Sequence, residues 1–225
     1  KPVDGGHLFL NLSEKNALVC KYKEAERYIH PYSNSEEFIN GKQRFCLWIN
    51  DNDHGNAKQF PEIEQRLLSV ERMRSESTKT QTQELAKFPY KFGEIRHRDS
   101  NYTIVVPRVS SENRPFLPVG LVKGGTVVGD RNFALYDAPL WNMALIASKL
   151  HWVWIGAVCV RLEMRFSYSN TLGWNTFPVP PLTEKNKEDL TACAEEILIA
   201  RERHFPATIA DLYDAENMPE DLRRA

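Results

Sequence analysis

Residues 160–169 read Val-Arg-Leu-Glu-Met-Arg-Phe-Ser-Tyr-Ser. Even-numbered positions are apolar or aromatic and odd-numbered positions are polar, so the stretch predicts a ten-residue β-strand with one buried and one exposed face. The exposed face would carry Arg161, Glu163, Arg165 and Ser167 at intervals of roughly 6.5–7 Å. These side chains have the donors and acceptors that can read base edges in a DNA groove. The same pattern also fits a solvated strand face with cross-strand ion pairs.

The composition is that of a globular chain with one substantial core. It has 225 residues, of which 42% are hydrophobic, and it carries 29 Lys and Arg against 30 Asp and Glu. The charges are unevenly placed: residues 58–180 hold 16 basic and 11 acidic residues, and residues 181–225 hold 6 and 11. A basic middle beside an acidic tail is compatible with nucleic acid contacting one face only.

The cysteines and the hydropathy pattern favour a cytoplasmic protein. The four cysteines lie far apart without zinc-ligand spacing, so we expect free thiols in a reducing compartment and no metal site. No apolar run approaches the roughly 20 residues that span a membrane, and no signal peptide is visible. The chain begins without Met at Lys1-Pro2-Val3, and we expect it to be a piece of a longer protein.

Several helices are expected from periodicity and capping signals. Ser13 is the predicted N-cap of a short helix, and Pro61 suits the first position of another. Residues 139–159 form a mostly apolar helical region with a break near Lys149, and Thr183 opens an amphipathic helix.

Strands are expected at residues 45–49 and 102–106, and a hairpin is expected from 119–122 to 127–128 around two glycines. With the helices, these strands predict a mixed α/β fold, in which an antiparallel or mixed sheet packs against helices. Prolines 178, 180 and 181 mark a boundary, so we predict one domain over residues 1–180 and a C-terminal helical extension over 181–225.

Basic and hydroxyl side chains outside the 160–169 stretch are candidates for phosphate contact. Arg66, Arg72, Arg74 and Lys79 lie on or beyond the predicted helix at Pro61, and for each of them a solvated helix face is the competing interpretation.

Motifs for catalysis are missing from the sequence. It lacks Gly-x-Ser-x-Gly, a Walker-type phosphate loop and His-Glu-x-x-His, and it has no glycine-rich loop for S-adenosylmethionine. His151 lies in the apolar helical region and is interpreted as a core histidine. No catalytic residue is predicted in this chain.

Seven stretches together resemble the target-recognition region of MmeI-like enzymes, type II restriction–modification proteins that join an endonuclease, an adenine-N6 methyltransferase and a DNA-reading domain. The resemblance spans nearly the whole chain in consistent order. The stretches are Asp4-Gly5-Gly6-His7-Leu8, Arg44-Phe45-Cys46-Leu47-Trp48-Ile49, Val106-Pro107-Arg108-Val109-Ser110-Ser111-Glu112, Leu135-Tyr136-Asp137-Ala138, Arg161 through Ser169, Asn175-Thr176-Phe177-Pro178 and Ala210-Asp211-Leu212-Tyr213-Asp214.

The resemblance implies which residues read bases. Glu163 and Arg165 form one pair, Arg108 and Asp130 a second, and Arg131 with Ser167 a third. Val160 stands where the family often has glycine before Arg-Leu. Chemically, arginine binds guanine bidentately and a carboxylate accepts from cytosine N4, so the first pair suits a G·C base pair.

The resemblance also implies the function. The chain would recognise double-stranded DNA for methyltransferase and endonuclease domains of the same polypeptide, and the parent would use S-adenosylmethionine and Mg²⁺, with no cofactor bound in this piece. Residues expected to contact DNA phosphates are Arg72, Arg74, Lys79, Ser110, Ser111 and Arg161. Competing interpretations are a protein–protein interaction module and a free-standing enzyme with an unfamiliar site.

Overall fold

A computed structural model describes residues 1–163 and 165–225, which form two compact units. The first unit comprises residues 1–33, 43–98 and 125–129, and the second comprises 34–42, 99–124 and 130–225. Each unit is discontinuous in sequence, so the predicted division between residues 180 and 181 does not coincide with the units and stays a prediction.

The first unit contains a four-stranded sheet in the order β1-β3-β2-β7. Strands β1 (Phe9–Leu10), β3 (Phe45–Leu47) and β2 (Ile29–Ser33) pair antiparallel, and β7 (Val127–Val128) joins β2 in parallel. Leu8, Leu47 and Ile63 are among the side chains with no exposed surface in the core of this unit. The strand predicted around residues 45–49 is confirmed.

Helices surround the sheet of the first unit. They are α1 (Leu12–Lys21), the 3₁₀ turn η1 (Lys23–Tyr28), α3 (His54–Ala57), α4 (Pro61–Ser75), α5 (Thr80–Glu84) and the 3₁₀ turn η2 (Leu85–Lys87). Pro61 occupies the first turn of α4, as predicted. The predicted cap at Ser13 is wrong, because Asn11 caps α1 and exchanges hydrogen bonds with Glu14.

The second unit contains two three-stranded sheets. In one, β4 (Tyr102–Pro107) lies between β6 (Gly120–Lys123) and β8 (Asn132–Tyr136), antiparallel to both. In the other, β10 (Arg165–Ser167) lies between β5 (Val109–Ser111) and β9 (Arg161–Leu162). Ile104, Val105 and Val106 are all buried, which fits the central position of β4.

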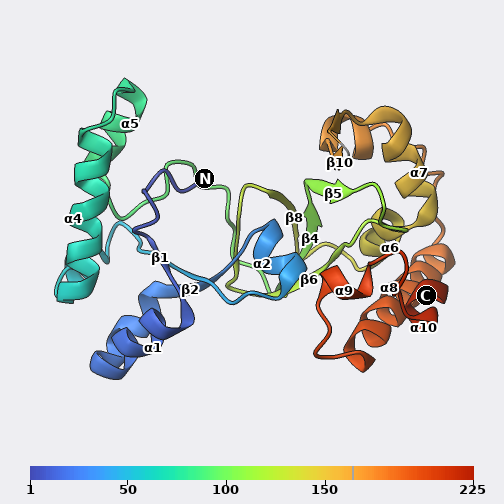
Figure 1. Ribbon diagram of the computed structural model, residues 1–225, viewed down its shortest axis with the longest axis horizontal. Coiled ribbons are helices and arrows are strands. Elements are labelled where there is room, and N and C mark those ends of the chain that lie inside the picture. The colour runs from blue at the N-terminus through green and yellow to red at the C-terminus, as the bar shows by residue number, and fades with distance from the viewer. Residues whose placement is uncertain (164) are drawn as a thin grey trace. The chain divides into compact units, whose positions relative to one another are not determined.

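Helices form much of the core of the second unit. They are α2 (Ser35–Asn40), α6 (Trp141–Ala147), α7 (Lys149–Val158), the π-helical turn η3 (Asn170–Trp174), α8 (Glu184–Arg203), α9 (Ile209–Leu212) and α10 (Glu220–Arg224). The long helix α8 packs against α6 and α10 (Figure 1). The break predicted near Lys149 is confirmed, because the Ser148 hydroxyl caps α7. Thr183 caps α8, also as predicted.

The chain reverses direction inside residues 160–169, which the alternating pattern did not predict. Strands β9 and β10 form an antiparallel hairpin, with Arg165 opposite Leu162 and Phe166 opposite Arg161, so the single ten-residue strand is wrong. Glu163 has φ = 55°, a left-handed conformation that an extended strand excludes. Met164, part of the predicted strand, lies outside the described residues.

The predicted hairpin across residues 119–128 is also wrong. β6 pairs with β4, whereas β7 pairs with β2 of the first unit. Gly124 donates its N–H to Asn101 O at 2.9 Å, and a Cβ on Gly124 would lie 2.3 Å from Ser100 O. This close approach holds the glycine turn against the start of β4. The chain changes direction at these glycines, but the strands on either side of them pair with other strands.

The mixed α/β fold class is confirmed by this combination of small sheets and packed helices. Within the part of the chain that the structure describes, none of the helices combines the length and the apolar character needed to cross a bilayer.

Candidate functional site

The β5–β10–β9 sheet positions several of the predicted base-reading residues. Arg165 lies opposite Ser111, Phe166 opposite Ser110 and Ser167 opposite Val109. Because side chains alternate along a strand, Phe166 is buried while Arg165 is exposed and Ser167 is half-buried. The hydrophobic side chain therefore anchors β10, and Arg165 extends into solvent from a strand bonded on both edges.

Ser110 faces the interior with Phe166. Its side chain is only 2% exposed, and its hydroxyl accepts a hydrogen bond from Arg114 Nη1 at 3.3 Å. Burial lowers the pKa of the Arg114 guanidinium. The predicted phosphate contact of Ser110 is contradicted by this burial. Ser111 is half-buried, and its phosphate contact remains a prediction.

Arg108 connects β10 to the turn at residues 130 and 131. Its carbonyl accepts from Tyr168 N–H at 2.7 Å, and its own N–H donates to Arg131 O at 3.0 Å. The Arg108 Nη1 donates to Asp130 O at 3.2 Å, and the guanidinium lies over the Phe133 ring at 5.2 Å. The structure thus joins Arg108, the turn and the end of β10, which are far apart in sequence.

We call the exposed side chains of Arg108, Asp130, Arg131, Glu163 and Arg165 the candidate surface. All five belong to the second unit. The structure does not place Glu163 and Arg165 on one strand face, because the chain reverses between them, so their pairing stays a prediction.

Arg161 is more constrained than the sequence suggested. Since it lies opposite Phe166, it shares a face with that ring, and its guanidinium lies 4.9 Å from the ring centroid. It also forms a 2.7 Å ion pair with Glu112, which follows β5. The ion pair links the hairpin to β5. A phosphate contact by Arg161 remains a prediction, and the phosphate would compete with the Glu112 carboxylate for the guanidinium.

Arg74, in the first unit, has no exposed surface. It donates hydrogen bonds to the carbonyls of Pro2, Val3, Leu85, Phe88 and Lys91 at 2.7–3.3 Å. Burial lowers the pKa of its guanidinium. The predicted phosphate contact of Arg74 is contradicted, because its guanidinium N–H groups are bonded to carbonyls inside the unit. These bonds hold residues 2–3 and the segment after α5 against α4.

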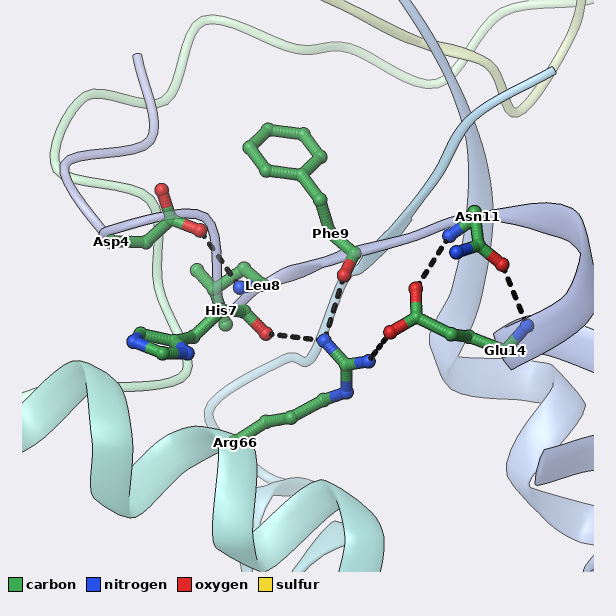
Figure 2. Close-up of polar contacts among 7 residues, drawn as sticks. All are labelled: Asp4, His7, Leu8, Phe9, Asn11, Glu14 and Arg66. Carbon is green, nitrogen blue, oxygen red and sulfur yellow. Dashed lines mark hydrogen bonds and ion pairs between the residues drawn. The ribbon is translucent and has the colours of Figure 1, made fainter.

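Arg66 is also occupied within the first unit, as Figure 2 shows. Nη1 donates to His7 O at 3.1 Å and Phe9 O at 2.8 Å, and Nη2 contacts the Glu14 carboxylate at 2.7 Å. Glu14, whose pKa is lowered chiefly by the Asn11 N–H and also by Arg66, in turn closes the cap of α1. Arg66 therefore ties α4 to the start of α1 and does not fit the phosphate prediction. Arg72 and Lys79 are exposed and remain predictions.

His151 lies in the core of the second unit near the end of β10. It has no exposed surface, and its Nε2 lies 3.2 Å from the Tyr168 hydroxyl. The Trp174 and Phe177 rings contact the imidazole edge-on. Burial lowers the pKa of His151 to about 4, so the ring is neutral at physiological pH. This is the core histidine that the sequence predicted.

Asn34 and Ser35 contact the main chain of Arg131, and no pattern in the sequence indicated these contacts. Asn34 Oδ1 accepts from Arg131 N–H at 2.8 Å, and Ser35 Oγ donates to Arg131 O at 2.5 Å. An Asn-Ser-Glu-Glu run signals a helix start. No sequence signal connects it with a turn about 97 residues away.

Comparison with known proteins identifies the family. The model for the MmeI target recognition domain matches residues 1–181, and the model for the MmeI C-terminal domain matches residues 182–225.

The chain belongs to the MmeI target recognition domain family. The predicted resemblance is confirmed. DNA methyltransferase A of Bacillus subtilis (strain 168) is 38% identical over 224 residues, which cover 100% of this chain and 25% of that protein. The structure of the type IIL restriction–modification enzyme MmeI in complex with DNA matches with a TM-score of 0.93 and 32% identity, over 100% of this chain and 30% of that one. The chain thus spans less than a third of the length of either of these relatives.

Proposed function

We propose that this MmeI-family chain recognises a specific sequence in double-stranded DNA on behalf of a combined restriction endonuclease and adenine-N6 methyltransferase. The observation that carries the proposal is the likeness over the entire chain, at a TM-score of 0.93, to a restriction–modification enzyme bound to DNA. The candidate surface supports it, because exposed arginines and carboxylates extend there from hydrogen-bonded main chain.

Each predicted reader has a chemical role in this proposal. Arg165 binds guanine O6 and N7, and Glu163 accepts from cytosine N4. Arg108 acts with Asp130, and Arg131 acts with Ser167. Ser111, Arg161, Arg72 and Lys79 contact phosphates and set the register of the duplex without reading sequence.

Catalysis belongs to the rest of the parent polypeptide in this proposal. A methyltransferase domain that uses S-adenosylmethionine would receive the flipped adenine, and an endonuclease domain would use Mg²⁺. These domains and the duplex are the proposed partners of the chain.

A protein–protein docking module is the second candidate. It is favoured by α7 and the residue that precedes β9, where Leu150, Val153 and Val160 are 61–70% exposed. Binding to duplex DNA that weakens steeply with added salt would support recognition of DNA, because phosphate contacts release counterions. Salt-insensitive capture of another protein domain, with no duplex binding, would support docking.

The decisive test maps methylated adenines in a genomic DNA library treated with the full-length parent and S-adenosylmethionine. Arg165→Ala should relax one base position by roughly 5- to 150-fold, the discrimination of a good bidentate contact. Exchanging Glu163 and Arg165 together should change the base preferred at that position. Arg203→Ala, at an exposed arginine near the end of α8, is the matched control and should leave the motif unchanged.

Two outcomes would contradict the assignment. Uniform loss of methylation at all sites in Arg165→Ala would make this arginine a phosphate contact. A wild-type parent that methylates no defined motif would overturn the proposed function itself.

A further inference from the structure

The start of α2 holds the main chain of the turn that carries two predicted readers. Arg131 N–H donates to Asn34 Oδ1 at 2.8 Å, and Ser35 Oγ donates to Arg131 O at 2.5 Å. The side-chain amide of Asn132 lies 2.8 Å from the same hydroxyl. Both the N–H and the C=O of Arg131 are thus engaged by a segment far away in sequence.

Arg108 also restrains the main chain of this turn, through hydrogen bonds to the carbonyls of Asp130 and Arg131. Its N–H donates to Arg131 O at 3.0 Å, and its Nη1 donates to Asp130 O at 3.2 Å. The side chains of Asp130 and Arg131 are nevertheless exposed. The turn therefore has a fixed main chain and solvent-facing side chains, which is the arrangement that a base-reading contact requires.

The Asn34 side chain contributes more than the start of a helix. Its N–H is bonded to the Glu37 carboxylate at 3.0 Å, and the side-chain oxygen is directed to Arg131. The segment itself is anchored, because Glu37 and Ile39 of α2 are buried and α2 packs against α9. An anchored segment can transmit a fixed position to the turn, whereas an exposed loop cannot.

We propose that Asn34 and Ser35 are positioning residues that hold the Asp130–Arg131 turn in register and thereby set the base preference at the positions this turn reads. This inference rests on the proposed function. Base discrimination depends on donors held within about 0.5 Å of the productive geometry. Loss of the Asn34 contact lets the turn shift, so that near-cognate bases are accepted at those positions and at no others.

The experiment uses the full-length parent, S-adenosylmethionine and the genomic DNA library, with Asn34→Ala, Asn34→Asp and Ser35→Ala. Asn34→Ala and Ser35→Ala should each lower discrimination about tenfold at the base positions that Asp130→Ala and Arg131→Ala relax, and at no others. Asn34→Asp keeps an oxygen acceptor for Arg131 N–H and should restore discrimination. Thr183→Ala, which removes a hydroxyl cap from α8 in the same unit, is the matched control for a small loss of stability and should leave the motif unchanged.

The possible results separate the inference from the function on which it rests. If Asn34→Ala and Ser35→Ala lower methylation equally at every site, as a loss of folded protein would, the positioning role is overturned and the proposed function stands. If Asp130→Ala and Arg131→Ala do not move the motif, the turn does not read DNA, and the inference fails with that assignment. If the wild-type parent methylates no motif, both fail.

Discussion

The arginines compared between the two units of this chain differ in exposure and in hydrogen bonding. In the first unit, Arg74 is completely buried and Arg66 is mostly so, and both donate to main-chain carbonyls. In the second unit, Arg108, Arg131 and Arg165 are exposed, while their main chains are fixed by neighbouring segments.

The difference shows that a basic sequence segment does not by itself mark a binding surface. A guanidinium has five donors in a rigid fork, which suits clustered carbonyls as well as it suits guanine or phosphate. What separates the two uses is whether main-chain acceptors surround the side chain. The Arg74 guanidinium donates to five carbonyls inside the fold, whereas that of Arg108 donates to one, and Arg108, Arg131 and Arg165 are exposed.

The largest expected effect is at Arg74. Arg74→Met should lower the free energy of unfolding by at least about 3 kcal/mol, because several buried carbonyls lose a charged donor at once. Urea unfolding measures this loss, and Arg72→Met, at an exposed arginine of the same helix, is the matched control with little effect. If Arg74→Met had wild-type stability but bound duplex DNA more weakly, the structural role of Arg74 would be contradicted, and Arg74 would instead be a phosphate contact.

The next effect concerns the buried histidine near β10. The pKa of His151 is lowered to about 4 in the folded state, so between pH 6.5 and pH 4 the unfolded chain binds more protons and stability falls as the pH falls. This group alone should cost about 2 kcal/mol between pH 7 and pH 5. Urea unfolding at the two pH values should show a smaller loss in His151→Gln than in the wild type. Equal losses would mean that His151 is already accessible to protons in the folded protein.

A smaller and opposite effect is expected at Glu163. Its φ of 55° is a conformation that glycine adopts without strain, so Glu163→Gly should raise the free energy of unfolding by about 0.5–1 kcal/mol. The same variant should lose discrimination at one base in the methylation map. A rise in stability with loss of specificity would mark Glu163 as a residue kept for recognition. A fall in stability would instead show that its side chain supports the hairpin.

The smallest effect is expected for the ion pair between Arg161 and Glu112. The Arg161 side chain is 57% exposed, so a double-mutant cycle with Arg161→Ala and Glu112→Ala should give a coupling free energy of about 0.2–1 kcal/mol. A coupling well above this range would show that Arg161 has a structural role like that of Arg66 and Arg74, and would argue against its predicted phosphate contact.

Local patterns in the sequence were sufficient for several elements. Pro61 predicted the start of α4, Thr183 predicted the cap of α8, and the apolar run around His151 predicted a helix and a core histidine. Each of these signals depends on residues within one or two turns of each other, so the surrounding fold does not alter them.

The errors in strand pairing occurred where the chain reverses or crosses between units. Alternation along residues 160–169 is compatible with one strand or with two strands joined by a short turn, and the left-handed conformation of Glu163 selected the second. The glycines after β6 resembled a hairpin turn, but β7 found its partner in β2. Pairing partners depend on long-range contacts that periodicity does not encode.

Sequence patterns alone were sufficient to predict the mixed fold class, the family and the residue types available for reading DNA. The exposure of each arginine could be known only from the fold, because it depends on which carbonyls the fold brings within hydrogen-bonding distance of each guanidinium. The fold also decided that Asn34 and Ser35 hold a turn about 97 residues away, since a hydrogen bond depends on distance in space and is independent of separation along the chain.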